Sequence, residues 1–224
     1  MKKEEFRLLY DYMTACAEGG AHDTEHVRRV LAYALEIART EKRVDHDVLI
    51  AACLLHDVGR EAQAKDPALC HAEVGAKMAY RFLREQGYTG DFAAAVRDAV
   101  LTHRFRKDRP PRSMEAKILF DADKLDVVGA MGIARTLEYR AEVGEPLYTL
   151  LPGGSVSDGD GDDSPSFFQE YHRKLKRIYD SFYTKRGTEI AESRRAAAER
   201  YYEALLTEVR ETYAMQEHLE KVVE

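Results

Sequence analysis

Cysteine is scarce in this chain, which has only Cys16, Cys53 and Cys70 among its 224 residues. An odd number of cysteines without a Cys-x-x-Cys spacing provides neither a disulfide framework nor a cysteine zinc site. The length and the 45% hydrophobic content instead allow a sizeable core to be buried. We therefore expect a globular protein of a reducing compartment.

The chain also lacks an excess of positive charge and long apolar runs. Its formal net charge is -6, so the composition gives no reason to expect a nucleic-acid polymer as partner, although local charge permits a small anionic substrate. The first residues, MKKEEFRLLYDYM, interrupt their apolar positions with charge, unlike a signal peptide. No later segment is apolar over the length of a membrane span. We expect a cytoplasmic protein with no membrane partner.

Alternation of apolar and polar residues is almost absent, which argues against β-strands. Apolar residues instead recur three and four positions apart, so we predict an all-α fold. Asp23, and Asp45 or Asp47, suit the N-caps of two helices. The longest helical stretch should bend or divide near Gly129 and Gly132. The predicted helices cover residues 4–17, 24–40, 45–55, 71–86, 91–103, 114–139, 167–183 and 188–213.

We predict one helical domain that carries a loop insertion. Residues 1–150 would form the helical core, and residues 167–224 would add C-terminal helices packed against it, completing the same domain. Between them, residues 151–166 (LPGGSVSDGDGDDSPS) have the composition of a flexible acidic loop that buries nothing. The Tyr residues near positions 201 and 213 suit either core contacts or a homodimer.

The loop invites a calcium interpretation, because Asp158, Asp160 and Asp162 stand at alternating positions. An EF-hand loop, however, needs glycine where this chain has Asp163, and a bidentate glutamate where it has Gln169. We therefore interpret the tract as a solvated loop.

A His-Asp doublet ends the most apolar stretch of the chain. His56 and Asp57 follow a nearly uninterrupted apolar run over residues 48–55, at a predicted helix end where Gly59 is a suitable stop. A carboxylate taken out of water costs several kcal/mol unless it is paired or protonated. A divalent metal ion would satisfy the imidazole and the carboxylate together.

Two further residues are the best candidates to join the doublet. Asp123 interrupts a second apolar segment, AKILFDADKLDVVGAMGIA, and so repeats the anomaly of Asp57. His26 lies in the first turn of a predicted helix. Either Asp121 or Asp126 could be the acid that turns inward instead. The earlier pair at positions 22 and 23 is a poorer candidate, because its Asp is more simply an N-cap.

The ordered His, His-Asp and Asp pattern resembles the HD superfamily of metal-dependent phosphohydrolases. The segments AHDTEHVRRV, AACLLHDVGR, LTHRF, MEAKILFDADKLDVVGAMGIART and TKRGTEIAESR resemble a bacterial branch with nucleotide pyrophosphohydrolases, over roughly residues 10–212. The resemblance implies an HD-domain helical bundle. It also favours Asp123 over Asp121 and Asp126, which are left for capping or supporting roles. Position by position, it implies one divalent metal ion held by His26, His56, Asp57 and Asp123.

Manganese is the metal that the resemblance implies, with magnesium, cobalt, nickel or iron as alternatives. Some HD proteins bind a second metal through two further histidines, which would here be His71 and His103. The alternatives are that these two imidazoles line the pocket, or that they merely begin and end helices. In the two-metal branches Lys usually stands at the position of Arg60, which disfavours an oxygen-activating di-iron centre.

The remaining candidates concern catalysis and phosphate binding. A divalent ion lowers the pKa of a bound water, so that water can attack phosphorus. Glu61 could take the proton, although it suits a solvated loop slightly better. The candidate catalytic side chains are Asp57, Glu61, His71 and His103. The candidate phosphate ligands are Arg60, Arg104 and Lys124, while Arg29 would brace Asp57 or another acid.

We therefore predict a metal-dependent phosphohydrolase acting on a small phosphate ester or anhydride, with nucleoside or deoxynucleoside triphosphates as the leading substrates. One alternative is a non-catalytic module of the same fold that senses a ligand or binds a partner. The other is an iron-dependent oxygenase.

Overall fold

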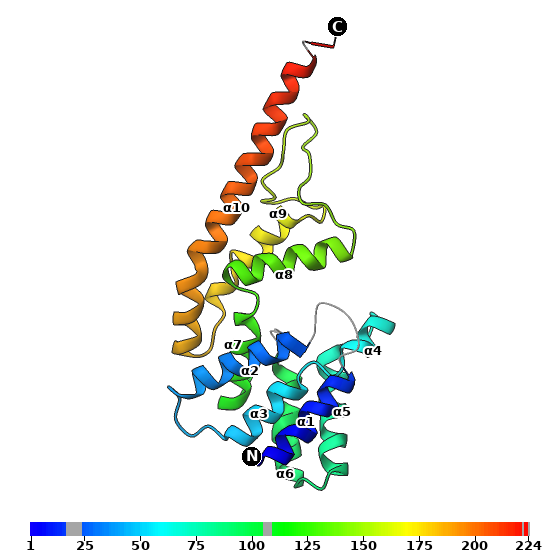
Figure 1. The fold of residues 1–224 in the computed structure, drawn as a ribbon, viewed down its shortest axis with the longest axis vertical. Helices are drawn as coiled ribbons and strands as arrows, with labels where there is room; N and C mark the ends of the chain where they lie inside the picture. The colour runs from blue at the N-terminus through cyan, green and yellow to red at the C-terminus, as the bar shows by residue number, and fades with distance from the viewer. Residues whose placement is uncertain (17–23, 105–108, 221, 224) are drawn as a thin grey trace. The chain divides into compact units, whose positions relative to one another are not determined.

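The computed structural model describes residues 1–16, 24–104, 109–220 and 222–223 (Figure 1). The fold is all-α, as predicted, and the described residues form no strand beyond one isolated β-bridge between Leu150 and Val156. None of the described helices is both long enough and apolar enough to cross a membrane. The α-helices are α1 (Lys3–Cys16), α2 (Thr24–Ala38), α3 (His46–Leu55), α4 (Arg60–Lys65), α5 (His71–Glu85), α6 (Gly90–Thr102), α7 (Met114–Leu125), α8 (Gly129–Glu142), α9 (Phe167–Glu170) and α10 (Lys185–Glu220). A π-helix, η1 (Tyr171–Leu175), and a 3-10 helix, η2 (Ile178–Asp180), follow α9.

The chain forms two compact units. Unit 1 comprises residues 1–126 and 182–188, and unit 2 comprises residues 127–181 and 189–224. That residues 1–150 and 167–224 complete a single domain stays a prediction.

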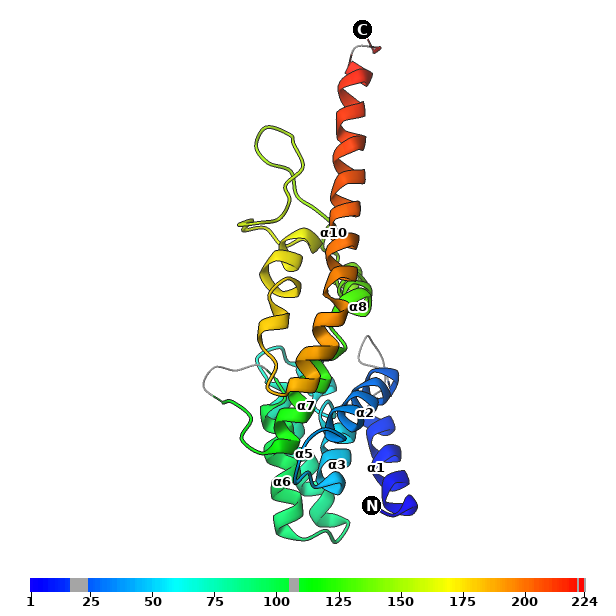
Figure 2. The same cartoon turned by 90° about the vertical axis from the view of Figure 1, so that its left-hand side faces the viewer.

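Helix α3 is the centre of unit 1. It contacts α1, α2, α5, α6 and α7, and Figure 2 shows it lying among these helices. All of its residues from Val48 to Leu55 except Ile50 are buried, as expected of a helix that is apolar on every side. The side chain of Asp45 caps its N-terminus by accepting hydrogen bonds from the backbone N–H groups of Asp47 and Val48. The chain after Leu55 therefore emerges inside the core.

A close backbone contact brings the start of α5 beside the end of α3. A Cβ atom added at Gly59 would collide with the carbonyl oxygen of His71 and would lie 2.6 Å from the nitrogen of Gly75. Only glycine fits this position without displacing backbone. Gly59 was expected to be a helix stop, and it lies between α3 and α4 as the residue before α4 begins.

The predicted division of the 114–139 stretch is confirmed. Helix α7 ends at Leu125 and α8 begins at Gly129, which has a φ of 64°. Glycine adopts this left-handed conformation without a steric cost. The break leaves Asp123 in the last turn of α7, and it leaves Asp126 at the C-cap.

Asp121 anchors the start of α10 within unit 1. Its fully buried carboxylate accepts hydrogen bonds from the backbone N–H groups of Tyr183 (2.8 Å) and Thr184 (2.7 Å) and from the Thr184 hydroxyl (2.7 Å). This is the capping role that the sequence had left open for Asp121.

The prediction of one regular helix over residues 167–183 is wrong. The N–H groups of Tyr183 and Thr184 bind Asp121 instead of helix carbonyls, and the preceding turns divide into α9, η1 and η2.

Unit 2 has a hydrophobic core of its own. The core consists of Ile133, Val156, Phe167, Phe168, Tyr171, Leu175, Ala198 and Tyr202.

The expectation that the 151–166 tract buries nothing is wrong, because Val156 and Ser166 are buried. The Asp162 carboxylate accepts hydrogen bonds from the hydroxyls of Thr149 and Ser157, which folds the tract onto itself. The flexibility of this loop stays a prediction.

Gly59→Ala should destabilise unit 1, because the added methyl group meets backbone atoms that cannot move aside. We expect a loss of roughly 2–4 kcal/mol in the free energy of unfolding, measured by chemical denaturation. Gly90→Ala is the matched control, because only a flexible arginine tip lies within 4.0 Å of the added atom. Equal stability of the two variants would contradict this account of Gly59.

Candidate metal centre

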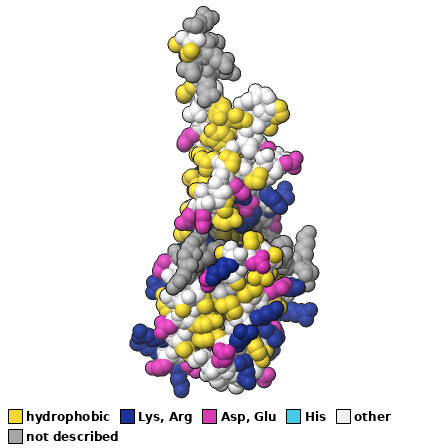
Figure 3. Space-filling model, turned by 90° about the vertical axis from the view of Figure 1, so that its right-hand side faces the viewer, with side chains coloured by type: hydrophobic (Ala, Val, Ile, Leu, Met, Phe, Trp, Pro, Cys, Tyr) yellow, Lys and Arg dark blue, Asp and Glu magenta, His cyan; other side chains and the backbone are white. Residues whose placement is uncertain are grey.

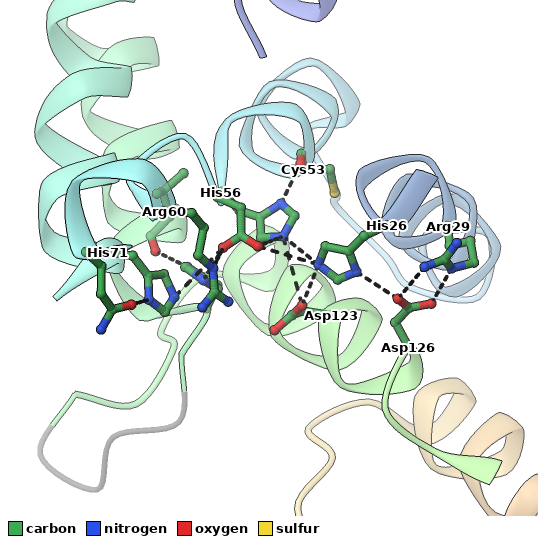
Figure 4. A network of polar contacts seen from close by, with 12 residues as sticks. His26, Arg29, Cys53, His56, Arg60, His71, Asp123 and Asp126 are labelled. Atoms are coloured by element: carbon green, nitrogen blue, oxygen red, sulfur yellow. Dashed lines mark hydrogen bonds and ion pairs between the residues drawn. The ribbon is translucent and has the colours of Figure 1, made fainter. Parts of the chain in front are cut away.

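Six ionisable side chains from five helices of unit 1 converge on one region (Figure 4). His26 comes from α2, and His56 and Asp57 directly follow α3. His71 is the first residue of α5, His103 is the C-cap of α6, and Asp123 lies in α7. Five of the six are buried, and Asp123 keeps 24% of its side-chain surface exposed. They come from sequence positions as far apart as His26 and Asp123.

The first group consists of His26, His56 and Asp123. Their nearest ligand atoms all lie within 4.8 Å of one another. The two Nε2 atoms are 3.3 Å apart, and His26 Nε2 is 3.3 Å from Asp123 Oδ1. Figure 4 shows these three side chains pointing toward one another. Two imidazole nitrogens and one carboxylate oxygen thus surround a common point.

The second group consists of Asp57, His71 and His103. Asp57 Oδ1 is 3.5 Å from His103 Nε2 and 3.8 Å from His71 Nε2. The other oxygen of Asp57, Oδ2, is 3.6 Å from the Nε2 atoms of both His26 and His56. The Asp57 carboxylate therefore faces both groups, with a different oxygen turned to each.

Hydrogen bonds from Nδ1 orient three of the four imidazoles. The Nδ1–H of His56 donates to the carbonyl oxygen of Cys53 (2.7 Å), and that of His103 donates to the carbonyl of Val100 (2.6 Å). The Nδ1–H of His71 donates to the side-chain oxygen of Gln63 (2.6 Å). Because these oxygens can only accept, the proton of each neutral ring is on Nδ1, and its Nε2 lone pair faces the cluster.

His26 is held by an acid instead. Its Nδ1 lies 2.7 Å from Asp126 Oδ2, and the guanidinium of Arg29 donates to both oxygens of that carboxylate. A carboxylate behind a ligating imidazole is a frequent supporting contact at metal centres. Arg29 braces an acid, as expected from the sequence, and that acid is Asp126.

The imidazoles of the cluster differ in pKa. Burial lowers the pKa of His56 to about 4, and burial with the nearby charge of Arg60 lowers the pKa of His71 to about 3. Both rings are therefore neutral near pH 7. Burial also acts to lower the pKa of His26, but hydrogen bonds to Asp123 and Asp126 outweigh it and raise the pKa to about 9.

Lys124 and Arg60 both lie close to the cluster. The Nε–H of Arg60 donates to Asp57 Oδ1 at 2.9 Å. The ammonium of Lys124 lies 4.1 Å from the centroid of the Phe120 ring, and burial lowers its pKa to about 8. Arg60 therefore neighbours the second group, and Lys124 neighbours the first.

Other predicted site residues are placed differently. Arg104 lies beside Cys70, with Nη1 3.9 Å from the sulfur atom. Glu61 is not brought into the cluster, because its carboxylate is 54% exposed and pairs with Lys65. The alternative pair at positions 22 and 23 lies outside the described residues, as does the predicted Asp23 N-cap.

Sequence reasoning missed the contacts that orient the rings. Cys53 and Val100 each lie three residues before the histidine they bind, and histidines placed just after a helix end are the signal that could have identified them. Gln63 carries no comparable signal, because its role depends on how α4 and α5 pack.

Comparison with known proteins agrees with this geometry. The HD domain family model matches residues 24–128. The YpgQ protein of Bacillus subtilis, an uncharacterized protein, is 31% identical over 181 residues, which is 79% of each chain. The chain belongs to the HD domain family. The region matched by the HD model contains all six residues of the cluster.

Solved structures of YpgQ and of HD-superfamily hydrolases are also similar to this chain. Bacillus subtilis YpgQ in complex with ADP has a TM-score of 0.69 at 26% identity, covering 91% of this chain and 97% of that one. An HD-superfamily hydrolase from an uncultured Thermotogales bacterium has a TM-score of 0.62 at 28% identity, covering 93% and 99%. An HD-superfamily hydrolase from Bacillus thuringiensis has a TM-score of 0.68 at 26% identity, covering 93% and 98%.

Asp126→Asn should weaken metal binding, because the amide supports the His26 ring less strongly than the carboxylate does. We expect Mn²⁺ affinity to fall by about 10-fold to 100-fold, measured by titration with detection of free Mn²⁺ by electron paramagnetic resonance. Asp98→Asn, at an exposed position in α6, should leave the affinity unchanged. Wild-type affinity in a folded Asp126→Asn protein would show that Asp126 does not support the centre.

Proposed function

We propose that this HD-domain protein is a metal-dependent phosphohydrolase that cleaves a phosphate ester or anhydride of a nucleotide. The observation that supports the proposal most strongly is the shared carboxylate of Asp57, whose two oxygens face two separate groups of ligand atoms. Such an arrangement suits one divalent ion in the first group and accommodates a second ion beside it.

The donor set fits a divalent ion of intermediate softness. Imidazole nitrogen and carboxylate oxygen suit manganese, iron, cobalt, nickel and zinc, and no thiolate is among the ligand atoms. The Nε2 atoms of His71 and His103 are buried and accept no hydrogen bond from the described residues. A buried acceptor left unsatisfied costs about 1–3 kcal/mol. A cation would remove that cost, and we propose Mn²⁺ as the ion of the first group.

When bound, the divalent ion would lower the pKa of a water molecule and neutralise phosphate charge. The protein's own cations would add to this. Arg60 is held by Asp57 through Nε alone and keeps 30% of its side chain exposed, so its terminal nitrogens can bind phosphate oxygens. Lys124, a half-buried residue next to Asp123, is the second phosphate ligand that we propose. Arg104 would contact a more distant part of the substrate.

The proton acceptor is assigned by elimination among the candidates. Glu61 is exposed and paired with Lys65, so we give it no role. A base whose pKa is about 3 takes protons poorly near pH 7, which makes His71 a better ligand than base. Asp57 Oδ1 and His103 Nε2 lie 3.5 Å apart, and we propose that this pair receives the proton when only the first group holds an ion. With an ion in the second group, His103 would be a ligand instead.

A nucleotide is the substrate class that the comparisons favour. The YpgQ structure, 26% identical to this chain, contains ADP. This agrees with the resemblance of the sequence to nucleotide pyrophosphohydrolases. We propose nucleoside or deoxynucleoside triphosphates first, cleaved to pyrophosphate or to phosphate.

Manganese-loaded protein should release phosphate or pyrophosphate from at least one member of a nucleotide panel. His56→Ala and Asp57→Ala should lose this activity almost entirely, because each removes a ligand that faces the proposed ion. His46→Ala is the control, since His46 is exposed at the start of α3. Tight nucleotide binding without product, measured by calorimetry, would instead indicate a ligand-sensing module.

Elemental analysis should count the metal ions. We expect two Mn²⁺ per chain at saturation, because each group brings three ligand atoms within 4.8 Å of one another. The His71→Ala/His103→Ala double variant should retain one, while His46→Ala should retain two. One ion in the wild type would remove the second site, and two iron atoms in protein purified without added metal would favour the oxygenase alternative.

A further inference from the structure

An open cavity at the surface, outside the metal centre, has four cationic residues among those that line it. It lies between α5 and α6, with a volume of about 580 Å³. The residues that line it are Lys77, Tyr80, Arg81, Arg84, Glu85 and Arg97. Four of these side chains are cationic and one is acidic, in a chain whose formal net charge is -6. Figure 3 shows Lys and Arg side chains standing out on both sides of the lower part of the surface in that view.

The helical repeat of α5 explains this concentration of charge. Lys77, Arg81 and Arg84 are four and three residues apart, so they share one face of the helix. The opposite face of α5 is buried through Ala79, Leu83 and other small or apolar residues. Arg97 joins the three cations from α6.

The cavity is distinct from the metal centre. None of its lining residues belongs to the His and Asp cluster. Arg84 is 13 positions after His71 on the same helix, which corresponds to about 20 Å along the axis. Lys77 projects about 120° away from His71 around that axis. A ligand in this cavity would therefore bind outside the proposed catalytic site.

Two of the four cations already have partners. Arg97 donates from Nε to Asp98 at 2.8 Å, and Arg84 donates from Nη1 to the carbonyl oxygen of Tyr88 at 2.6 Å. Lys77 and Arg81 are exposed and form no ion pair with any residue that the structure describes. Both side chains line the cavity, and Glu85 is the acidic residue among those that line it.

We propose that this cavity binds a small molecule that carries two or more phosphate groups. Its volume is that of a small-molecule site. Lys77 and Arg81 supply the uncompensated donors, and Arg84 is held in place by its bond to Tyr88. The guanidinium of Arg97 lies 5.5 Å from the centroid of the Tyr80 ring, so an aromatic surface lies beside the cations. A nucleoside polyphosphate and an inorganic polyphosphate share the chemistry that this site recognises.

The test is calorimetric titration of the full-length chain with inorganic tripolyphosphate, after metal removal with a chelator. The wild type should bind, and Lys77→Ala/Arg81→Ala should lose about tenfold or more in affinity because two charge-assisted contacts are removed. Lys3→Ala/Arg7→Ala takes two cations from exposed positions of α1 and should bind as the wild type does. Thermal unfolding verifies that each variant is folded.

Binding that survives Lys77→Ala/Arg81→Ala, or that falls equally in the α1 control, would overturn the proposal. So would absence of binding to the wild type. A single-stranded oligonucleotide that binds more tightly than tripolyphosphate, and loses its affinity in the same α5 variant, would overturn the assignment to a small ligand. Titration with ATP in the absence of metal distinguishes a nucleoside polyphosphate from an inorganic polyphosphate. If ATP binds more tightly than tripolyphosphate and Tyr80→Ala removes the difference, the ligand is a nucleoside polyphosphate. If the two bind equally, the ligand is an inorganic polyphosphate. Because these titrations need neither metal nor turnover, their failure is separate from failure of the proposed hydrolase activity.

Discussion

The burial of the Asp57 carboxylate is the constraint on which the centre depends. Asp57 follows a helix whose apolar residues pack on every side, and only 8% of its surface is exposed. A negative charge in such surroundings is stable only if positive charge or polar hydrogen meets it. Arg60 supplies one such contact, and His26, whose pKa is raised, lies 3.6 Å from the other oxygen. The Nε2 lone pairs of the other three imidazoles also face the carboxylate, which leaves room for a cation between them. The convergence of five helices is therefore tied to the electrostatics of one side chain.

Helix ends make this convergence possible. Neighbouring residues within a helix point about 100° apart, so a histidine and an aspartate that follow each other meet most easily where the helix finishes. The last carbonyls of a helix have no partner within it. In α3 and α6 these carbonyls accept the Nδ1–H groups of His56 and His103. In each case the helix end thus places the histidine side chain in the cluster and orients its ring.

The sequence was sufficient for the fold class and for the set of residues that meet. Polar residues in apolar segments, at His56, Asp57 and Asp123, identified positions whose burial would be costly unless they met, and the structure brings them together. It was insufficient for contacts set by packing. Gln63 reaches His71 because Gly59 lets the backbone of α5 approach, and no local pattern encodes that distance. Similarly, Glu61 is a residue type that can act as a base, but its pairing with Lys65 depends on the direction in which α4 leaves the core.

The way the rings are oriented has a consequence for how this centre can change during evolution. His56 and His103 are fixed by main-chain oxygens, which persist whatever side chain occupies positions 53 and 100. His71 and His26 depend on the side chains of Gln63 and Asp126, which a single nucleotide change in the gene can replace. Divergence among homologues that alters the cluster while keeping all six of its residues should thus accumulate at these two supporting positions.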